Sequence, residues 1–139
     1  ELIALEAKLG LDKAETLRKL NHKISQVRDK LHNLIHSLKA DGKSIAGFGA
    51  PTKATTLMAH FGLDATVLDF IVDDNPLKQG LFTPITHIPV LSADALYKIK
   101  PDYVLILAWN FAEPIMQMHK KYSEQVGQFI LPMPNPEIV

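Results

Sequence analysis

After residue 43 the sequence alternates short apolar runs with helix-like stretches, and this alternation restricts the fold more than any other feature. The apolar runs are candidate strands, and they fall at Ser44–Phe48, Val67–Val72, Ile88–Leu91, Tyr103–Ala108 and Gln128–Leu131. Strands that alternate with helices form a mainly parallel sheet with helices on both faces. The sequence therefore predicts an α/β fold, a Rossmann-like three-layer domain with a five-stranded sheet.

Helix signals occupy the stretches between these runs. Pro51 suits the first turn of a helix, where a missing amide proton costs little, and Gly62 marks its end. Ser92 is the expected N-cap of the next helix. We expect helices at residues 51–60, 92–99 and 112–124. We expect no regular structure after the last strand, because three prolines follow it, Pro132, Pro134 and Pro136.

A long amphipathic helix is predicted ahead of the α/β part. Its apolar residues alternate in steps of three and four, and they are Leu17, Leu20, Ile24, Val27, Leu31, Leu34 and Leu38. Asp41 and Gly42 supply the stop. The same spacing suits a helix laid along its own domain, a bridge to a neighbour, or a coiled coil that makes a homodimer. We therefore divide the chain into a connecting helix region, 1–41, and an α/β domain, 42–139.

Composition narrows the class of protein. A chain of 139 residues suits one domain, and its equal numbers of acidic and basic residues predict neither nucleic acid nor a membrane as partner. The absence of cysteine fits a reducing compartment, and we expect a cytoplasmic protein. The longest apolar run, Tyr103–Trp109, is far shorter than the roughly 20 residues that span a bilayer. Because the chain starts at Glu1 without a signal peptide, we expect a piece of a longer polypeptide.

The turn Gly47-Phe48-Gly49-Ala50-Pro51-Thr52-Lys53 is the main candidate for a ligand site. It follows a strand and opens a helix, the setting in which backbone amides contact a phosphate. Thr52 stands where the dinucleotide fingerprint has Gly or Ala, and Pro51 removes one amide, whereas Lys53 adds a positive charge. A tight turn without a ligand remains the alternative.

Further candidates lie where other strands end. Asp73 follows the second strand, where dinucleotide-binding folds place an acid for ribose hydroxyls, although acids are also common in turns. Trp109 and Asn110 leave the fourth strand and are expected to stack on a base and hydrogen-bond to it; alternatively, Trp109 caps the core. The polar loop 73–89 is stiffened by prolines and adds Asn75, Lys78, Gln79, Thr86 and His87.

The histidines give weaker signals. His87 is a candidate acid, base or hydrogen-bond donor, with a packed histidine at a strand start as the alternative. His32 and His36 stand one helical turn apart, a spacing that suits a metal. No third ligand is evident nearby, so we expect two solvated histidines and no metal site.

The chain from about Gly42 onward resembles the C-terminal domain of the S-adenosylmethionine-dependent sugar C-methyltransferase family. Four blocks in the same order carry the resemblance, namely residues 47–53, 72–80, 83–90 and 100–110. The sequence departs from the family pattern at three positions. The family commonly has a basic residue at Asp74 and glycine at Ile85 and Ala54.

The resemblance implies a three-part enzyme of deoxysugar biosynthesis, in which a nucleotide-sugar is methylated between this domain and a methyltransferase domain of the same polypeptide. It implies that S-adenosylmethionine binds to that other domain and zinc to a cysteine-rich N-terminal region. Ser44-Ile45-Ala46 indeed lacks the carboxylate of the S-adenosylmethionine glycine motif. The alternative function is an independent NAD- or nucleotide-binding regulatory module.

Overall fold

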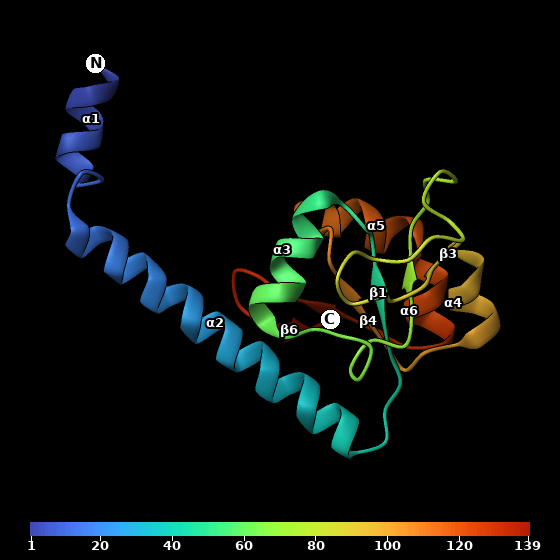
Figure 1. Ribbon diagram of the computed structural model, residues 1–139. Helices are drawn as coiled ribbons and strands as arrows, with labels where there is room; N and C mark the ends of the chain where they lie inside the picture. Colours follow the sequence, from blue (N-terminus) through green and yellow to red (C-terminus); the bar gives the residue numbers. More distant parts are fainter.

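The computed structural model describes residues 1–139 and contains one six-stranded sheet with helices on both faces (Figure 1). The helices are α1 (Leu2–Leu9), α2 (Ala14–Ala40), α3 (Thr52–Phe61), α4 (Asp94–Ile99), the short 3₁₀ helix η1 (Trp109–Phe111), α5 (Ala112–Met118) and α6 (Lys120–Gln125). The strands are β1 (Ile45–Phe48), β2 (Ile71–Val72), β3 (Val90–Leu91), β4 (Tyr103–Ile106), β5 (Gln128–Leu131) and β6 (Glu137–Ile138). The mixed α/β class expected from the sequence is confirmed.

The strands follow the order β3-β2-β1-β4-β5-β6, and all neighbours are parallel except β5 and β6. The prediction of five strands was wrong, because the chain returns after the prolines and β6 pairs antiparallel with β5. The three prolines occupy the connection, where a missing amide does not interrupt a ladder. Ile138, beyond them, faces Ile130 in the sheet.

Each face of the sheet packs its own apolar core. On one face, α2 and α3 contribute side chains such as Leu31, Leu57 and Phe61, which pack against sheet residues including Ile45 and Leu105. On the other face, α4, α5 and α6 cover Phe48, Val104 and Ile106. Neighbouring residues of one strand enter opposite cores, as strand geometry requires.

Three local predictions need correction. Val67 and Leu68 are buried but lie in a turn, where both amides donate to the Asp64 carbonyl, so β2 contains only Ile71 and Val72. The expected helix at 112–124 is two helices, because at the break the Tyr122 amide donates to the carbonyl three residues back. Ser92 does not cap α4 through its hydroxyl; instead its carbonyl accepts from an amide of the first turn.

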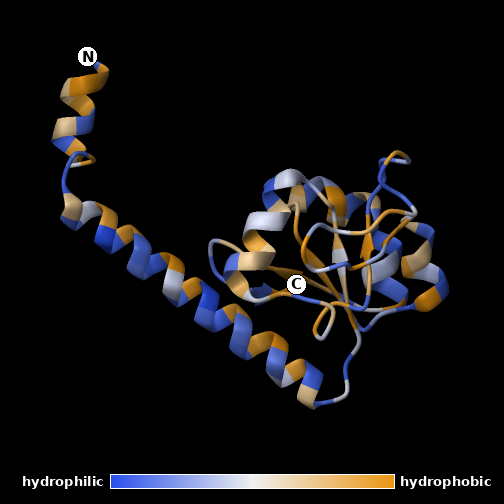
Figure 2. Ribbon diagram, viewed as in Figure 1, coloured by the Kyte–Doolittle hydropathy of each residue, from blue (hydrophilic) through white to orange (hydrophobic).

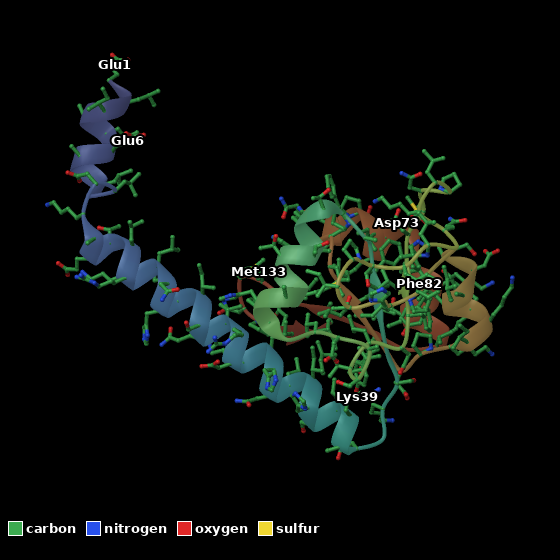
Figure 3. The ribbon with its side chains drawn as sticks, in the orientation of Figure 1. Glu1, Glu6, Lys39, Asp73, Phe82 and Met133 are labelled. Carbon is green, nitrogen blue, oxygen red and sulfur yellow. The ribbon has the colours of Figure 1, made fainter.

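The N-terminal helices extend away from the sheet (Figure 1). Helix α2 ends at Ala40, and Gly42 follows with a φ of 73°, so the predicted stop is confirmed. Only the C-terminal half of α2 has buried residues, namely Leu31, Ile35 and Leu38. Helix α1 has no buried residue and lies far from the sheet, with Glu1 just before it and Glu6 within it (Figure 3).

Candidate functional site

The carboxyl ends of β1 and β4 meet at the point where the strand order reverses. The chain leaves β1 through α3 and returns as β2 on one side, whereas β4 lies on the other side of β1. Open α/β sheets bind ligands outside the carboxyl ends of their strands at this point. We therefore expect a ligand site at the segments that follow the two strands, residues 49–53 and 107–111.

Both glycines of the turn have a structural explanation. A Cβ at position 47 would lie 2.9 Å from both Ile71 Cγ1 and Leu107 Cδ1, inside the packed sheet. Gly49 has a φ of 87°, which favours glycine, and its amide donates to the Val72 carbonyl at 2.7 Å. The glycines are thus required by the fold, whether or not a ligand binds.

Asp73 holds the glycine turn from the neighbouring strand. It is 8% exposed, and its carboxylate accepts hydrogen bonds from the amides of Ala50 at 2.7 Å and Asn75 at 2.9 Å. The ammonium of Lys78 lies 3.0 Å from the same carboxylate. Burial raises the pKa of Asp73, but these hydrogen bonds and the lysine outweigh it and leave the pKa below its ordinary value. Three of the roughly four acceptor positions of the carboxylate are therefore filled from within the chain.

Other polar side chains of the loop 73–89 hold the loop itself. Asn75 accepts from the Leu77 amide at 3.0 Å, and Gln79 donates to the Asp73 carbonyl at 2.9 Å. Thr86 pairs with the buried hydroxyl of Thr83 at 2.7 Å. In contrast, His87 is exposed and lies just before β3, at the amino end of that strand and not at the carboxyl edge of the sheet.

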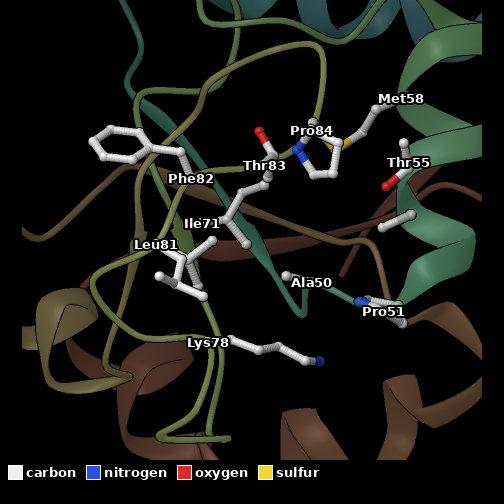
Figure 4. A pocket seen from close by; sticks show the side chains of 12 residues that line it. Ala50, Pro51, Thr55, Met58, Ile71, Lys78, Leu81, Phe82, Thr83 and Pro84 are labelled. Carbon is white, nitrogen blue, oxygen red and sulfur yellow. The ribbon is translucent and has the colours of Figure 1, made fainter.

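A pocket of about 190 Å³ opens between α3 and this loop (Figure 4). Its walls are mainly apolar, and they include Met58, Ile71, Leu81 and Phe82. Lys78 is the only charged side chain that lines it. Sites for drug-sized molecules measure about 300–1,000 Å³, so this pocket is suited to a single ring rather than to a whole dinucleotide.

Lys53 and Trp109 join the two sides of the switch point. The Lys53 ammonium lies 4.5 Å from the centroid of the Trp109 ring and 5.8 Å from that of Phe111. The amides of Thr52 and Lys53, at the start of α3, have no hydrogen-bond partner within the chain. Asn110, which follows Trp109 in the chain, is exposed. A cation, free helix amides and an indole ring thus share one edge, a combination suited to an anion linked to a ring.

One buried polar residue at this edge escaped the sequence analysis. His119 is 7% exposed; its Nδ1 lies 3.2 Å from the Tyr97 hydroxyl, and its Nε2 has no partner. Its ring lies 4.9 Å from that of Phe48, at the end of β1. Burial lowers the pKa of His119, and the charge of Asp74 opposes this shift. No motif or spacing marks a lone histidine, so only the tertiary structure reveals its position.

The structure contains neither a cluster of potential metal ligands nor a helix that could span a membrane. The Nε2 atoms of His32 and His36 are 2.9 Å apart on the exposed face of α2. No group of three or more potential metal ligands gathers anywhere in the chain. None of the helices combines the length and apolar character needed to cross a bilayer.

The fold is that of an α/β domain, with a candidate ligand site at the carboxyl edge of its sheet. Residues 1–134 match the family model of the C-methyltransferase C-terminal domain, and the chain belongs to that family. It is 37% identical over 139 residues to the C-methyltransferase NovU of Streptomyces niveus. That match covers the whole chain but 33% of the relative, so the chain spans about a third of the length of this curated relative. The resemblance found in the four sequence blocks is thereby confirmed.

Proposed function

We propose that this chain is the substrate-side C-terminal domain of an S-adenosylmethionine-dependent C-methyltransferase that acts on a nucleotide-linked sugar. Family membership supports the methyltransferase part of this proposal. The observation that carries the substrate side is the contact of Lys53 with Trp109 at the switch point. It places a positive charge and a stacking surface where a Rossmann-like sheet binds its ligand.

The geometry suggests a position for each part of such a substrate. The diphosphate would bind to the free amides of Thr52 and Lys53 and to the Lys53 ammonium. The nucleobase would enter the apolar pocket beside Ala50 and Pro51, whose size suits a single ring system. The sugar would then extend toward Trp109 and Asn110. This placement moves the anion away from the Ala50 amide, because Asp73 already occupies that donor.

The residues of this chain do not fit S-adenosylmethionine. The strand before the turn reads Ser44-Ile45-Ala46 and carries no carboxylate, and the Ala50 amide is already bound. The chain also lacks cysteine for the zinc that the family resemblance implies. We therefore assign methyl-donor binding and zinc to the remaining part of the polypeptide. Methyl transfer would occur where that part faces the carboxyl edge of this sheet.

The alternative, an NAD-binding module, is less well supported. It needs Asp73 as an acceptor for ribose hydroxyls, but that carboxylate already holds Ala50, Asn75 and Lys78. It also needs a small residue at the helix-packing position, which Thr52 occupies. Titration with NADH tests this alternative, because a true site gives saturable fluorescence enhancement.

Calorimetry with a nucleoside-diphosphate sugar tests the proposal. We expect Lys53→Ala to weaken binding by about tenfold or more, which corresponds to about 1.4 kcal/mol. Lys121→Ala is the matched control, because Lys121 is an exposed lysine of α6, on the other face of the sheet. Equal affinities for the two variants would remove the phosphate role of Lys53. Trp109→Leu, with inorganic pyrophosphate as a second probe, separates stacking from charge.

A further inference from the structure

The apolar stripe of α2 has two different environments. Its C-terminal part packs into the core, and Leu31 is 0% exposed. Its N-terminal part lies beyond the sheet, where Leu17, Leu20 and Ile24 are 58%, 54% and 39% exposed (Figure 2). We call these three residues the free stripe. The C-terminal half of one continuous heptad pattern thus packs into the core of the domain, whereas its N-terminal half is exposed to solvent.

Helix α1 adds to this exposed apolar surface. It has eight residues, none of them buried, and Leu2, Ile3, Leu5 and Leu9 are all exposed. Isolated helices shorter than about 12–15 residues are marginal in water. Large contiguous apolar surfaces on soluble domains mark interaction sites. The exposed apolar residues of region 1–24 therefore indicate an interaction surface.

A groove between α2 and α3 continues the free stripe to the candidate site. It measures about 450 Å³, and Ile24, Leu57, Phe61 and Met133 form its apolar walls. Lys53 and Trp109 line the same groove. Whatever lies on the free stripe and fills the groove therefore reaches the residues that we propose for substrate binding.

Charge argues against a second copy of α2 as the occupant. Residues 14–30 contain five basic side chains (Arg18, Lys19, Lys23, Arg28, Lys30) against two acidic ones (Glu15, Asp29). Lys23 and Lys30 border the stripe on one side, and Arg28 borders it on the other. In a coiled coil the bordering residues of two helices meet. Parallel pairing brings Lys23 toward Arg28, and antiparallel pairing brings Lys23 toward Lys30.

We infer that the free stripe and the α2–α3 groove seat the remaining part of the same polypeptide, through an apolar surface edged by acidic side chains. The relative NovU is about three times the length of this chain, and the matched family is a C-terminal domain, so such a part precedes this domain in the relative. The inference rests on the proposed function, because it identifies that part as the one that binds the methyl donor. Seating it there brings it beside Lys53 and Trp109.

Zero-length carbodiimide cross-linking of the full polypeptide tests the chemistry of this surface. We expect Lys23 and Lys30 to couple to carboxylates of the remaining part within one molecule, whereas Lys121 does not. Mixing isotopically light and heavy protein separates couplings within a molecule from those between copies. Couplings between copies at Lys23 would overturn the inference in favour of a homodimer, and no coupling to the remaining part would also overturn it.

Hydrogen exchange of residues 14–27 in the full polypeptide is the second measurement. We expect Leu20→Ser to accelerate this exchange about tenfold or more, and Ile99→Ser to leave it unchanged. Ile99 is the matched control, since it is 55% exposed and lies on α4. Equal exchange in the two variants would contradict the inference. If residues 14–27 of the unmodified full polypeptide are protected from exchange but the polypeptide binds no nucleotide-sugar, the proposed function alone is refuted.

Discussion

The carboxylate of Asp73, at the end of β2, accepts a hydrogen bond from the Ala50 amide after β1, with 2.7 Å between oxygen and nitrogen. The Lys78 ammonium lies 3.0 Å from the same oxygen. The Ala50 amide is thus already bound to an anion of the chain itself, and Lys78 balances the charge of that anion. An external anion has the Thr52 and Lys53 amides left, so this contact shifts the expected ligand position along α3.

We predict that Asp73→Ala lowers the free energy of unfolding by about 3 kcal/mol, because it leaves two amides and a lysine without their partner. The neighbouring Asp74 is exposed and makes no hydrogen bond, so Asp74→Ala should change stability by less than about 0.5 kcal/mol. Urea unfolding of both variants measures the difference. Similar midpoints for the two would show that Asp73 does not hold the turn.

At the opposite edge of the sheet, Asp102 is expected to make the stability of the fold depend on pH. Hydrogen bonds from the amide and hydroxyl of Ser44, at 2.9 and 2.7 Å, lower the pKa of Asp102 to about 2. A lowered carboxyl pKa stabilises the fold above the unfolded value, and this contribution disappears as pH falls toward the folded value. We expect Ser44→Ala to raise the pKa of Asp102 and to flatten the loss of stability between pH 4 and 2.

NMR titration of the carboxyl carbon of Asp102 provides the direct measurement. Ser123→Ala is the control, because Ser123 is exposed and its hydroxyl bonds to the carbonyl of Lys120. An Asp102 pKa that stays near 2 in Ser44→Ala would mean that the backbone amide of residue 44, which the variant keeps, lowers the pKa without the hydroxyl, with Lys43 3.3 Å from the carboxylate as a further contributor.

The sequence predicted the parts of the fold that depend on local signals. The stops at Gly42 and Gly62 were correct, because each glycine adopts a positive φ that ends a helix. The predicted length of β2 was too great, because Val67 and Leu68 are apolar and buried as strand residues are, but they belong to a turn. The prediction missed β6, because pairing across five intervening residues is a tertiary contact that no local pattern encodes.

The candidate site divides in the same way. The positions of Lys53, Asp73 and Trp109 at strand ends followed from their places after apolar runs. Their partners did not, because the Asp73 contact with Ala50 and the Lys53 contact with Trp109 depend on how neighbouring strands are ordered. The sequence gives no sign that Asp73 is already bound.

His119 predicts a second pH effect, of a different origin. Burial lowers its pKa, so the unfolded chain takes up the proton first as pH falls below about 6.5. Stability should therefore decrease from about pH 6.5 downward until the folded histidine is protonated as well. We expect His119→Phe to remove this slope, because phenylalanine has no proton to bind. Thermal unfolding across pH 5–7 measures it, with His60→Phe on the exposed side of α3 as the control. An unchanged slope would assign the effect to another group.

Ile85 predicts a gain in stability. It is 75% exposed and has a φ of 67°, a left-handed conformation that is unfavourable for a β-branched residue. Release of this strain is worth about 1–2 kcal/mol, and the entropy cost of glycine offsets about 0.5–1 kcal/mol. We expect Ile85→Gly to raise the free energy of unfolding by about 0.5–1 kcal/mol and the melting temperature by about 2–3 °C. Ile85→Val keeps the branched Cβ and should give no gain. A glycine variant no more stable than the valine variant would show that the loop carries no strain at this position.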